Sequence, residues 1–242
     1  MAKKSTSRSK SRRVKILLAL NLLLLASGGW TMCQNPDWWR LPLHTLGIDV
    51  TRRVAASDEM AARIVGAAKS QQGTHYSAAY VQIAYPGGDV TPQKGACSDV
   101  IVRALRGAGY DLQALIHQDM TRNWAAYPSR WGLDHPDANI DHRRVPNQMI
   151  FFARHGLKLS NEVSEATRKQ WQPGDIVCWK TGPRRWHTGV LSDGLNAQNW
   201  PLVVHNGSIC VEADCLTRWT IIGHYRFPLR AKIKAWKSRF RL

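Results

Sequence analysis

The order of helical and extended segments constrains the fold of this chain more than any other feature. Apolar side chains recur at helical spacing over residues 58–69, 97–108 and 145–156, and D-L-Q-A-L-I-H-Q-D-M predicts a short helix between the last two. Ser57 is the N-cap that we expect for the first helix. Four strand-like stretches follow, namely I-V-C-W, H-T-G-V-L-S, P-L-V-V-H-N and I-I-G-H-Y-R-F, with turns between them. This order predicts an α+β fold, with N-terminal helices packed on a mainly antiparallel sheet.

The positive charge of the chain is concentrated at its two ends. The 242 residues carry a formal net charge of +17, but seven Lys/Arg residues lie in 1–15 and six in 229–242, with no acidic residue in either stretch. The remaining 21 basic residues face 17 acidic ones, so the body of the chain is nearly balanced. No RNA-binding or helix-turn-helix pattern occurs in it, and we do not expect nucleic acid as a partner.

The N-terminal segment has the pattern of an export signal. The basic stretch precedes an apolar run from Ile16 to Ala26, and small residues follow it, so that cleavage after Gly28 is one reading. An uncleaved anchor is another reading, and a buried helix of the domain is the third. We therefore assign 1–30 to an export signal or anchor, 31–56 to a linker, and 57–228 to the folded domain. The domain is expected outside the cytoplasm, either periplasmic or held at the inner membrane.

The C-terminal tail, residues 229–242, has an amphipathic pattern. Apolar side chains at helical spacing alternate with its basic residues; they are Leu229, Ile233, Trp236 and Phe240. Such a helix suits an anionic membrane or a wall polymer, which are the partners that we expect for the two termini. A terminal helix packed on the domain is the alternative.

Five cysteines leave one without a partner if the others pair. Cys210 and Cys215 close a short loop, and they are either a disulfide of an oxidising compartment or two small buried side chains. Cys97 differs, because it opens a predicted helix whose N–H groups and dipole favour a thiolate. Those groups can also hold the oxyanion of an acyl-transfer reaction.

Two histidines on predicted strands complete a candidate catalytic site. His187 begins the stretch H-T-G-V-L, where Gly189 leaves space on the same face, and it can act as the base for Cys97. His205 or the neighbouring Asn206 can orient that imidazole. The residues therefore predict a cysteine nucleophile with a His-His or His-Asn pair, and no cofactor.

Four segments in one order resemble a known family. G-A-C-S-D-V, P-G-D-I-V-C-W, H-T-G-V-L-S-D and V-V-H-N are similar to the motifs of the NlpC-type branch of papain-like bacterial cell-wall hydrolases, over residues 85–227. The resemblance implies a papain-like fold and a cysteine peptidase or amidase that cleaves peptidoglycan peptides or a related envelope substrate. It assigns Cys97 as nucleophile, His187 as base and His205 as the orienting residue. An acyltransferase or thioesterase, and a non-catalytic peptidoglycan-binding module, are the alternatives.

The chain departs from the family in two places. The stretch D-A-N-I-D-H-R-R-V-P-N is absent from common members, which suggests a separate exported subfamily. Cys-Ser-Gly becomes Cys-Ser-Asp, and Asp99 should stabilise the helix start while opposing a thiolate.

Further residues are candidates for substrate binding: Tyr85, Ser98, Arg143 and Arg144. The two arginines could bind peptide carboxylates from a loop that closes over the site, or they could belong to a salt-bridged surface loop. Tyr85 could line the cleft, or it could simply pack against the domain. Asp137, Asp141 and His142 lie in the same loop, but their spacing fits no zinc motif, and we expect no metal.

Overall fold

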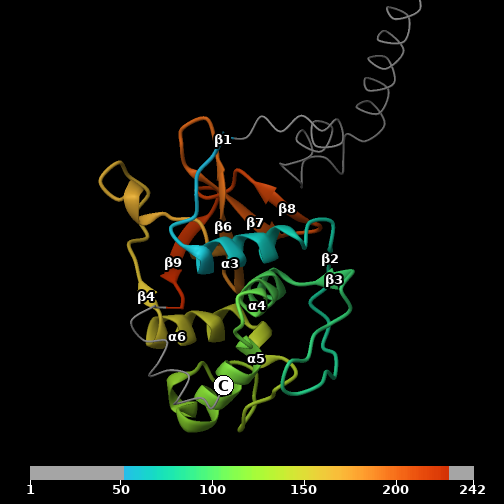
Figure 1. The fold of residues 1–242 in the computed structure, drawn as a ribbon. Helices are drawn as coiled ribbons and strands as arrows, with labels where there is room; N and C mark the ends of the chain where they lie inside the picture. The colour runs from blue at the N-terminus through green and yellow to red at the C-terminus, as the bar shows by residue number, and fades with distance from the viewer. Residues whose placement is uncertain (1–51, 229–242) are drawn as a thin grey trace, which may run out of the picture. The chain divides into compact units, whose positions relative to one another are not determined.

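The computed structural model describes residues 52–228 (Figure 1). The predicted export segment and the basic tail lie outside these residues, as does most of the predicted linker. Residues 52–56 of the predicted linker are described, and Arg52–Arg53 among them form the short strand β1. None of the helices between residues 52 and 228 is both long enough and apolar enough to cross a lipid bilayer.

The described elements are four α-helices, three short 3₁₀ helices and nine strands. In chain order they are β1 (Arg52–Arg53), α3 (Glu59–Lys69), β2 (His75–Tyr76), β3 (Lys94–Gly95), α4 (Cys97–Gly107), α5 (Leu112–Arg122), η2 (Trp124–Ala126), η3 (Asp141–Arg143), α6 (Val145–His155), β4 (Leu157–Lys158), η4 (Arg168–Gln170), β5 (Ile176–Gly182), β6 (Arg185–Leu195), β7 (Pro201–Asn206), β8 (Cys210–Ala213) and β9 (Thr220–Arg226). The α+β prediction is confirmed.

The helix starts follow local capping chemistry. The predicted N-cap Ser57 is wrong by one residue, because the Asp58 carboxylate accepts the N–H of Ala61 at 2.8 Å. The N-cap of α4 is Ala96, whose methyl group cannot accept a hydrogen bond. The Asp99 carboxylate instead accepts the N–H of Ala96 at 2.6 Å, which ties down the turn that carries Cys97.

One antiparallel sheet carries both candidate histidines. Its strands lie in the order β4-β9-β5-β6-β7-β8, and β1 pairs with the far end of β6. The register places Trp179 of β5 opposite His187 of β6, and Gly189 of β6 opposite His205 of β7. The two histidines therefore lie on the adjacent strands β6 and β7, close to the same end of the β6–β7 pair.

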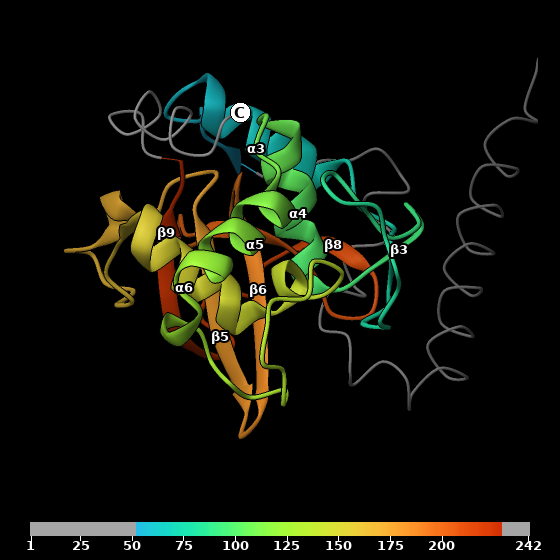
Figure 2. The ribbon, with the colours of Figure 1, turned by 90° about the horizontal axis from the view of Figure 1, so that it is seen from below.

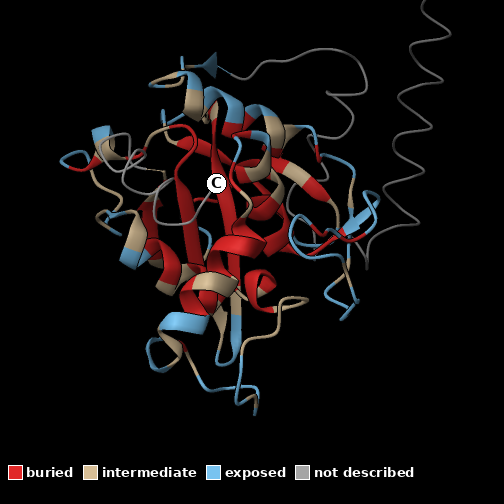
Figure 3. Cartoon of the chain, turned by 60° about the horizontal axis from the view of Figure 1, so that its bottom comes forward, coloured by how far each residue is buried: buried red, intermediate tan, exposed pale blue. Residues whose placement is uncertain are grey.

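The sheet separates two apolar clusters. Helices α4, α5 and α6 lie over one face of the sheet (Figure 2), and most of the central strands is buried (Figure 3). Helices α3 to α6 cover one cluster, and alternate residues of the strands point into it: Ile176, Cys178, Val190, Val204 and Cys210. Neighbouring strand residues point into the cluster on the other side: Val177, Trp179, Leu191, Val203 and Ala213. This period of two is the expected alternation of a sheet that is buried on both faces.

Cys210 and Cys215 do not form a disulfide. Both are free and buried, and they belong to the clusters on opposite sides of the sheet. Residues 210–213 are instead the edge strand β8, which pairs with β7 and was not predicted. Of the two alternatives for these cysteines, small buried side chains is the one that the structure supports.

Candidate active site

Cys97 lies at the first residue of α4, beside the strand that carries His187. Only 5% of the residue is exposed. Backbone N–H groups of Thr188, Ser98 and Cys97 itself lie close enough to the sulfur to lower the pKa of the thiol. Because Thr188 directly follows His187, this contact places the sulfur against the β6 backbone next to the histidine.

The pKa of the Cys97 thiol moves in the direction opposite to our expectation. Burial raises it to about 11, and the negative charge of Asp99 acts in the same direction. The three backbone N–H groups oppose this shift without overcoming it. The effect expected from Asp99 is present, but the predicted net stabilisation of a thiolate is wrong for this state, because desolvation outweighs the helix start.

His187 and His205 are in direct contact. The Nε2 atom of His187 lies 2.9 Å from Nδ1 of His205, and the two rings are nearly perpendicular, at 88°. Gly189 permits this approach of β7: a Cβ at that position would lie 2.6 Å from Cγ1 of Val203 and 2.9 Å from the carbonyl oxygen of Val204. The contact uses Nε2 of His187, so Nδ1 is the ring nitrogen left for another partner.

Two tryptophans enclose the His187 ring. Trp179 stacks on it, with centroids 5.6 Å apart, and Trp219 meets it edge-on at 5.3 Å. Burial, together with the charges of His205 and Arg218, lowers the pKa of His187 to about 3. The base and the thiol are therefore both neutral at pH 7, and within the described residues no hydrogen bond joins Cys97 to the His187 ring.

Asn206 has a different role from the one considered for it. Its side-chain amide donates to the carbonyl oxygens of Thr74 and Gly95, at 3.1 and 2.9 Å. It thereby ties the end of β7 to the segments that precede Cys97. Of the two candidates for orienting His187, the structure brings only His205 to it.

Arg143 does not face a substrate. Its Nε and Nη2 donate to the Asp99 carboxylate at 2.8 and 2.9 Å, and its Nη1 donates to the carbonyl oxygen of Ala79 at 2.8 Å. Both side chains of the ion pair are almost completely buried, at 2% and 3% exposure. The guanidinium holds the turn in front of α4, and for Arg143 these contacts favour the salt-bridged alternative over substrate binding.

Arg144 belongs to the same salt-bridged loop. Its Nη1 donates to the buried Asp141 carboxylate at 2.7 Å, and its guanidinium lies 4.0 Å from the Trp131 ring centroid. The structure thus favours the salt-bridged alternative for this loop. Among residues 52–228, no three His, Cys, Asp or Glu side chains converge as metal ligands would.

Ser98 is buried beside the nucleophile, at 1% exposure, and its carbonyl oxygen accepts the Gln148 amide at 3.1 Å. Only its backbone N–H reaches the sulfur of Cys97. Tyr85 is 45% exposed and its ring packs edge-on against His117, at 4.9 Å. Within the described residues, no hydrogen bond or ring contact joins Tyr85 to the site, so its packing alternative is the one observed.

The tyrosine beside the thiol is Tyr76, which the sequence did not single out. Burial raises its pKa, and the charges of Cys97 and Asp99 act on it in the same direction, so the phenol lies within electrostatic range of both groups. The residue is nevertheless 44% exposed, at the border between the thiol and solvent. Its place is set by β2 pairing with β3, immediately before α4, and no spacing in the sequence announces that pairing.

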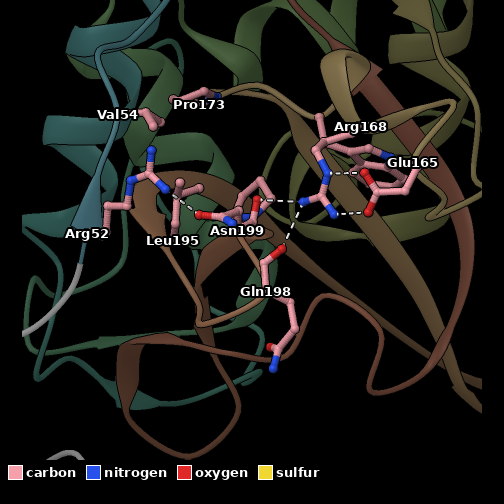
Figure 4. Close-up of a pocket in the computed structure, with 10 residues that line it drawn as sticks. Arg52, Val54, Glu165, Arg168, Pro173, Leu195, Gln198 and Asn199 are labelled. Atoms are coloured by element: carbon pink, nitrogen blue, oxygen red, sulfur yellow. Dashed lines mark hydrogen bonds and ion pairs between the residues drawn. The ribbon is translucent and has the colours of Figure 1, made fainter.

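A cavity lies away from the candidate catalytic residues. It has a volume of about 690 Å³, and Arg52, Arg168, Glu165 and Asn199 are among its lining residues (Figure 4). Arg52 donates to the Asn199 side chain at 2.6 Å, and Arg168 pairs with Glu165. None of the three candidate catalytic residues lines this cavity, and its charged groups already have partners.

Comparison with known proteins identifies a family and a relative. Residues 65–227 match the family described as Domain of unknown function (DUF1287). The uncharacterized protein YijF of Escherichia coli (strain K12) is 46% identical over 167 residues, which cover 68% of this chain and 80% of that protein. Cys97, His187 and His205 all lie inside the matched region. The chain therefore belongs to the DUF1287 family.

Proposed function

We propose that this protein is a cysteine hydrolase that cleaves an amide bond in peptidoglycan peptides or a related cell-envelope substrate. The observation that carries the proposal is the 2.9 Å contact between His187 and His205, beside a cysteine at the start of a helix. The resemblance to NlpC-type papain-like enzymes supports the same chemistry and suggests a papain-like fold.

The proposed reaction begins with proton transfer inside a neutral pair. Nε2 of His187 donates to His205, so Nδ1 can take the thiol proton as Cys97 attacks the carbonyl carbon. The attack forms a carbon–sulfur bond and places a negative charge on the carbonyl oxygen. His187 then returns the proton to the leaving amine, and water hydrolyses the thioester. His205 stabilises the transient imidazolium by keeping its ring in place.

Backbone N–H groups supply the oxyanion donors in this proposal. Those of Cys97, Ser98 and Thr188 act on the sulfur and lower its pKa, so they are the donors nearest to where the carbonyl oxygen of an attacked amide would lie. Fixed donors in a buried site stabilise a developing charge more than water does, and losing one costs about 10²–10³-fold in rate. The Tyr76 hydroxyl, next to Cys97, is a further donor at the solvent side.

The cellular setting is part of the same proposal. The N-terminal export pattern places the domain in the periplasm, free or anchored to the inner membrane. The basic tail would hold it on an anionic membrane or wall surface. Both segments lie outside the described residues, so the sequence alone supports this part.

Digestion of purified muropeptides tests the proposed activity. The wild type should release products that mass spectrometry identifies, whereas Cys97→Ser and His187→Ala should each abolish turnover and their effects should not add. His205→Ala should lose less. Cys215→Ala is the matched control, because it removes an equally buried thiol on the other side of the sheet.

The same experiment separates the alternatives. Binding of muropeptides without turnover by the wild type would indicate a binding module, and transfer of the acyl group to an added amine would indicate an acyltransferase. Full activity of a correctly folded Cys97→Ser variant would reject the assigned nucleophile.

A further inference from the structure

Arg218 carries an uncommitted positive charge. It lies in the turn between β8 and β9 and is exposed. Within residues 52–228, its guanidinium forms no hydrogen bond or ion pair. It rests instead over the ring of Trp219, with Cζ 4.8 Å from the centroid. Such stacking leaves the edge of the guanidinium, with its N–H groups, open to a ligand.

Trp219 connects this cation to the candidate catalytic histidines. Its ring lies 5.3 Å from that of His187 and 6.2 Å from that of His205, measured between centroids. Arg218 is also close enough for its charge to act on His187. The cation and the base therefore share one aromatic wall.

The balance of charge around the nucleophile leaves Arg218 unopposed. Asp99 is the acidic residue next to Cys97, and it is neutralised by Arg143 in a buried, two-bond ion pair. A substrate that enters from solvent thus meets a fixed positive charge at this side of the site. A guanidinium that stacks on an indole and keeps its donors free suits a planar carboxylate, which it can bind through two parallel hydrogen bonds.

We propose that Arg218, supported by Trp219, forms an anion-binding subsite that selects peptide substrates with a free carboxylate near the scissile amide. This inference rests on the proposed function for the identity of the occupant as a substrate of Cys97. It adds the substrate class, peptides with a free carboxylate, and the residue that recognises the carboxylate, Arg218.

Occupation of the subsite would also assist the chemistry. Arg218 disfavours a second positive charge on His187, and an imidazolium is what His187 becomes when it takes the thiol proton. A carboxylate paired with Arg218 cancels that repulsion. Substrates with the carboxylate should therefore gain both in binding and in turnover.

Binding to the full-length Cys97→Ala protein tests the subsite without requiring catalysis. The two probes are a disaccharide-tetrapeptide from digested peptidoglycan and the same compound with its carboxyl groups converted to amides. We expect the free acid to bind about 10- to 100-fold more tightly, the usual effect of a charged hydrogen-bonding partner. Adding Arg218→Gln should abolish the difference, and Arg218→Lys should restore part of it.

Arg184→Gln is the matched control, because Arg184 is exposed in the turn between β5 and β6 and its loss removes the same charge. It should keep the preference for the acid. Equal binding of the two probes, or a preference that survives Arg218→Gln, would overturn the subsite. Turnover by the wild-type protein is measured separately. A wild type that prefers the acid but cleaves neither probe would refute the hydrolase and retain the subsite.

In an active wild type, the kinetic constants extend the test. Arg218→Gln should raise KM for the free acid and leave KM for the amidated probe close to that of the wild type. Because the variant also loses the repulsion between Arg218 and the His187 imidazolium, kcat for the amidated probe should not fall. Equal losses on both probes would show a general structural role and would refute selection by Arg218.

Discussion

Replacing Arg143 by methionine separates a structural arginine from a substrate-binding one. Arg143→Met keeps an unbranched side chain but removes the guanidinium that neutralises Asp99. Both partners are at most 3% exposed, and two hydrogen bonds of 2.8 and 2.9 Å join them. Breaking a buried pair in this way leaves an uncompensated charge and costs about 3–5 kcal/mol.

That free energy is large enough to measure with certainty. For a domain of this size, each kcal/mol lowers Tm by about 2–4 °C, so Arg143→Met should melt roughly 6–20 °C below the wild type. Thermal unfolding followed by circular dichroism, together with urea unfolding, measures the change. Arg63→Met is the control, because Arg63 is exposed and makes one hydrogen bond, of 3.2 Å, to the carbonyl oxygen of Gly107. Its change should stay within about 0.5 kcal/mol.

A second variant shows whether the stranded charge causes the loss. In the double variant Asp99→Asn/Arg143→Met, the amide oxygen can still accept the N–H of Ala96, and no unpaired carboxylate remains. The double variant should therefore be more stable than Arg143→Met alone. If Arg143→Met has the same Tm as the wild type and loses only substrate affinity, our structural assignment of Arg143 is wrong. In that case Arg143 binds substrate, which is the alternative that the sequence left open.

Three further predictions follow from the site and its surroundings. The pKa of His187 is lowered to about 3 and that of Cys97 is raised to about 11. We therefore expect kcat/KM for muropeptides to stay level from about pH 5 to 9 and to fall below this range as His187 becomes protonated. A change of kcat/KM with pH near neutrality would contradict a neutral resting pair. Gly189→Ala should push β7 away, because the new Cβ would lie 2.6 Å from Cγ1 of Val203. We expect the free energy of unfolding, measured with urea, to fall by about 1–3 kcal/mol, and turnover to fall as well. Unchanged turnover would show that the close approach of β7 is unnecessary. Burial lowers the pKa of His142 from 6.5 to about 3, so its contribution to the free energy of unfolding is present above pH 6.5 and is lost as the pH falls toward 3. The free energy of unfolding of His142→Phe should therefore fall less steeply over that range than that of the wild type. Identical slopes for the two proteins would refute this prediction.

Local patterns predicted the elements of this fold well, because they depend on residues near in the chain. The apolar spacing at 97–108 corresponds to α4, and the strand-like stretch that begins at Ile176 corresponds to β5. Edge strand β8 escaped prediction, because its pairing with β7 and not its own composition defines it. The N-cap of α3 shifted by one residue for a similar reason: either Ser57 or Asp58 can cap, and only the backbone geometry decides which does.

The sequence by itself pointed to Cys97 and His187, with His205 or Asn206 to orient the imidazole, since Cys97 opens a predicted helix and the other three fall on predicted strands. The structure then brought His205, and not Asn206, to His187. Tertiary structure decided what surrounds them. Asp99 pairs with Arg143, which is 44 residues away in the chain. Burial, which no local pattern encodes, reverses the expected shift in the pKa of Cys97. Trp219 likewise reaches His187 only through the antiparallel order of the sheet, which brings distant residues together. Charge partners and desolvation depend on distances in space, so they became readable only in the folded chain.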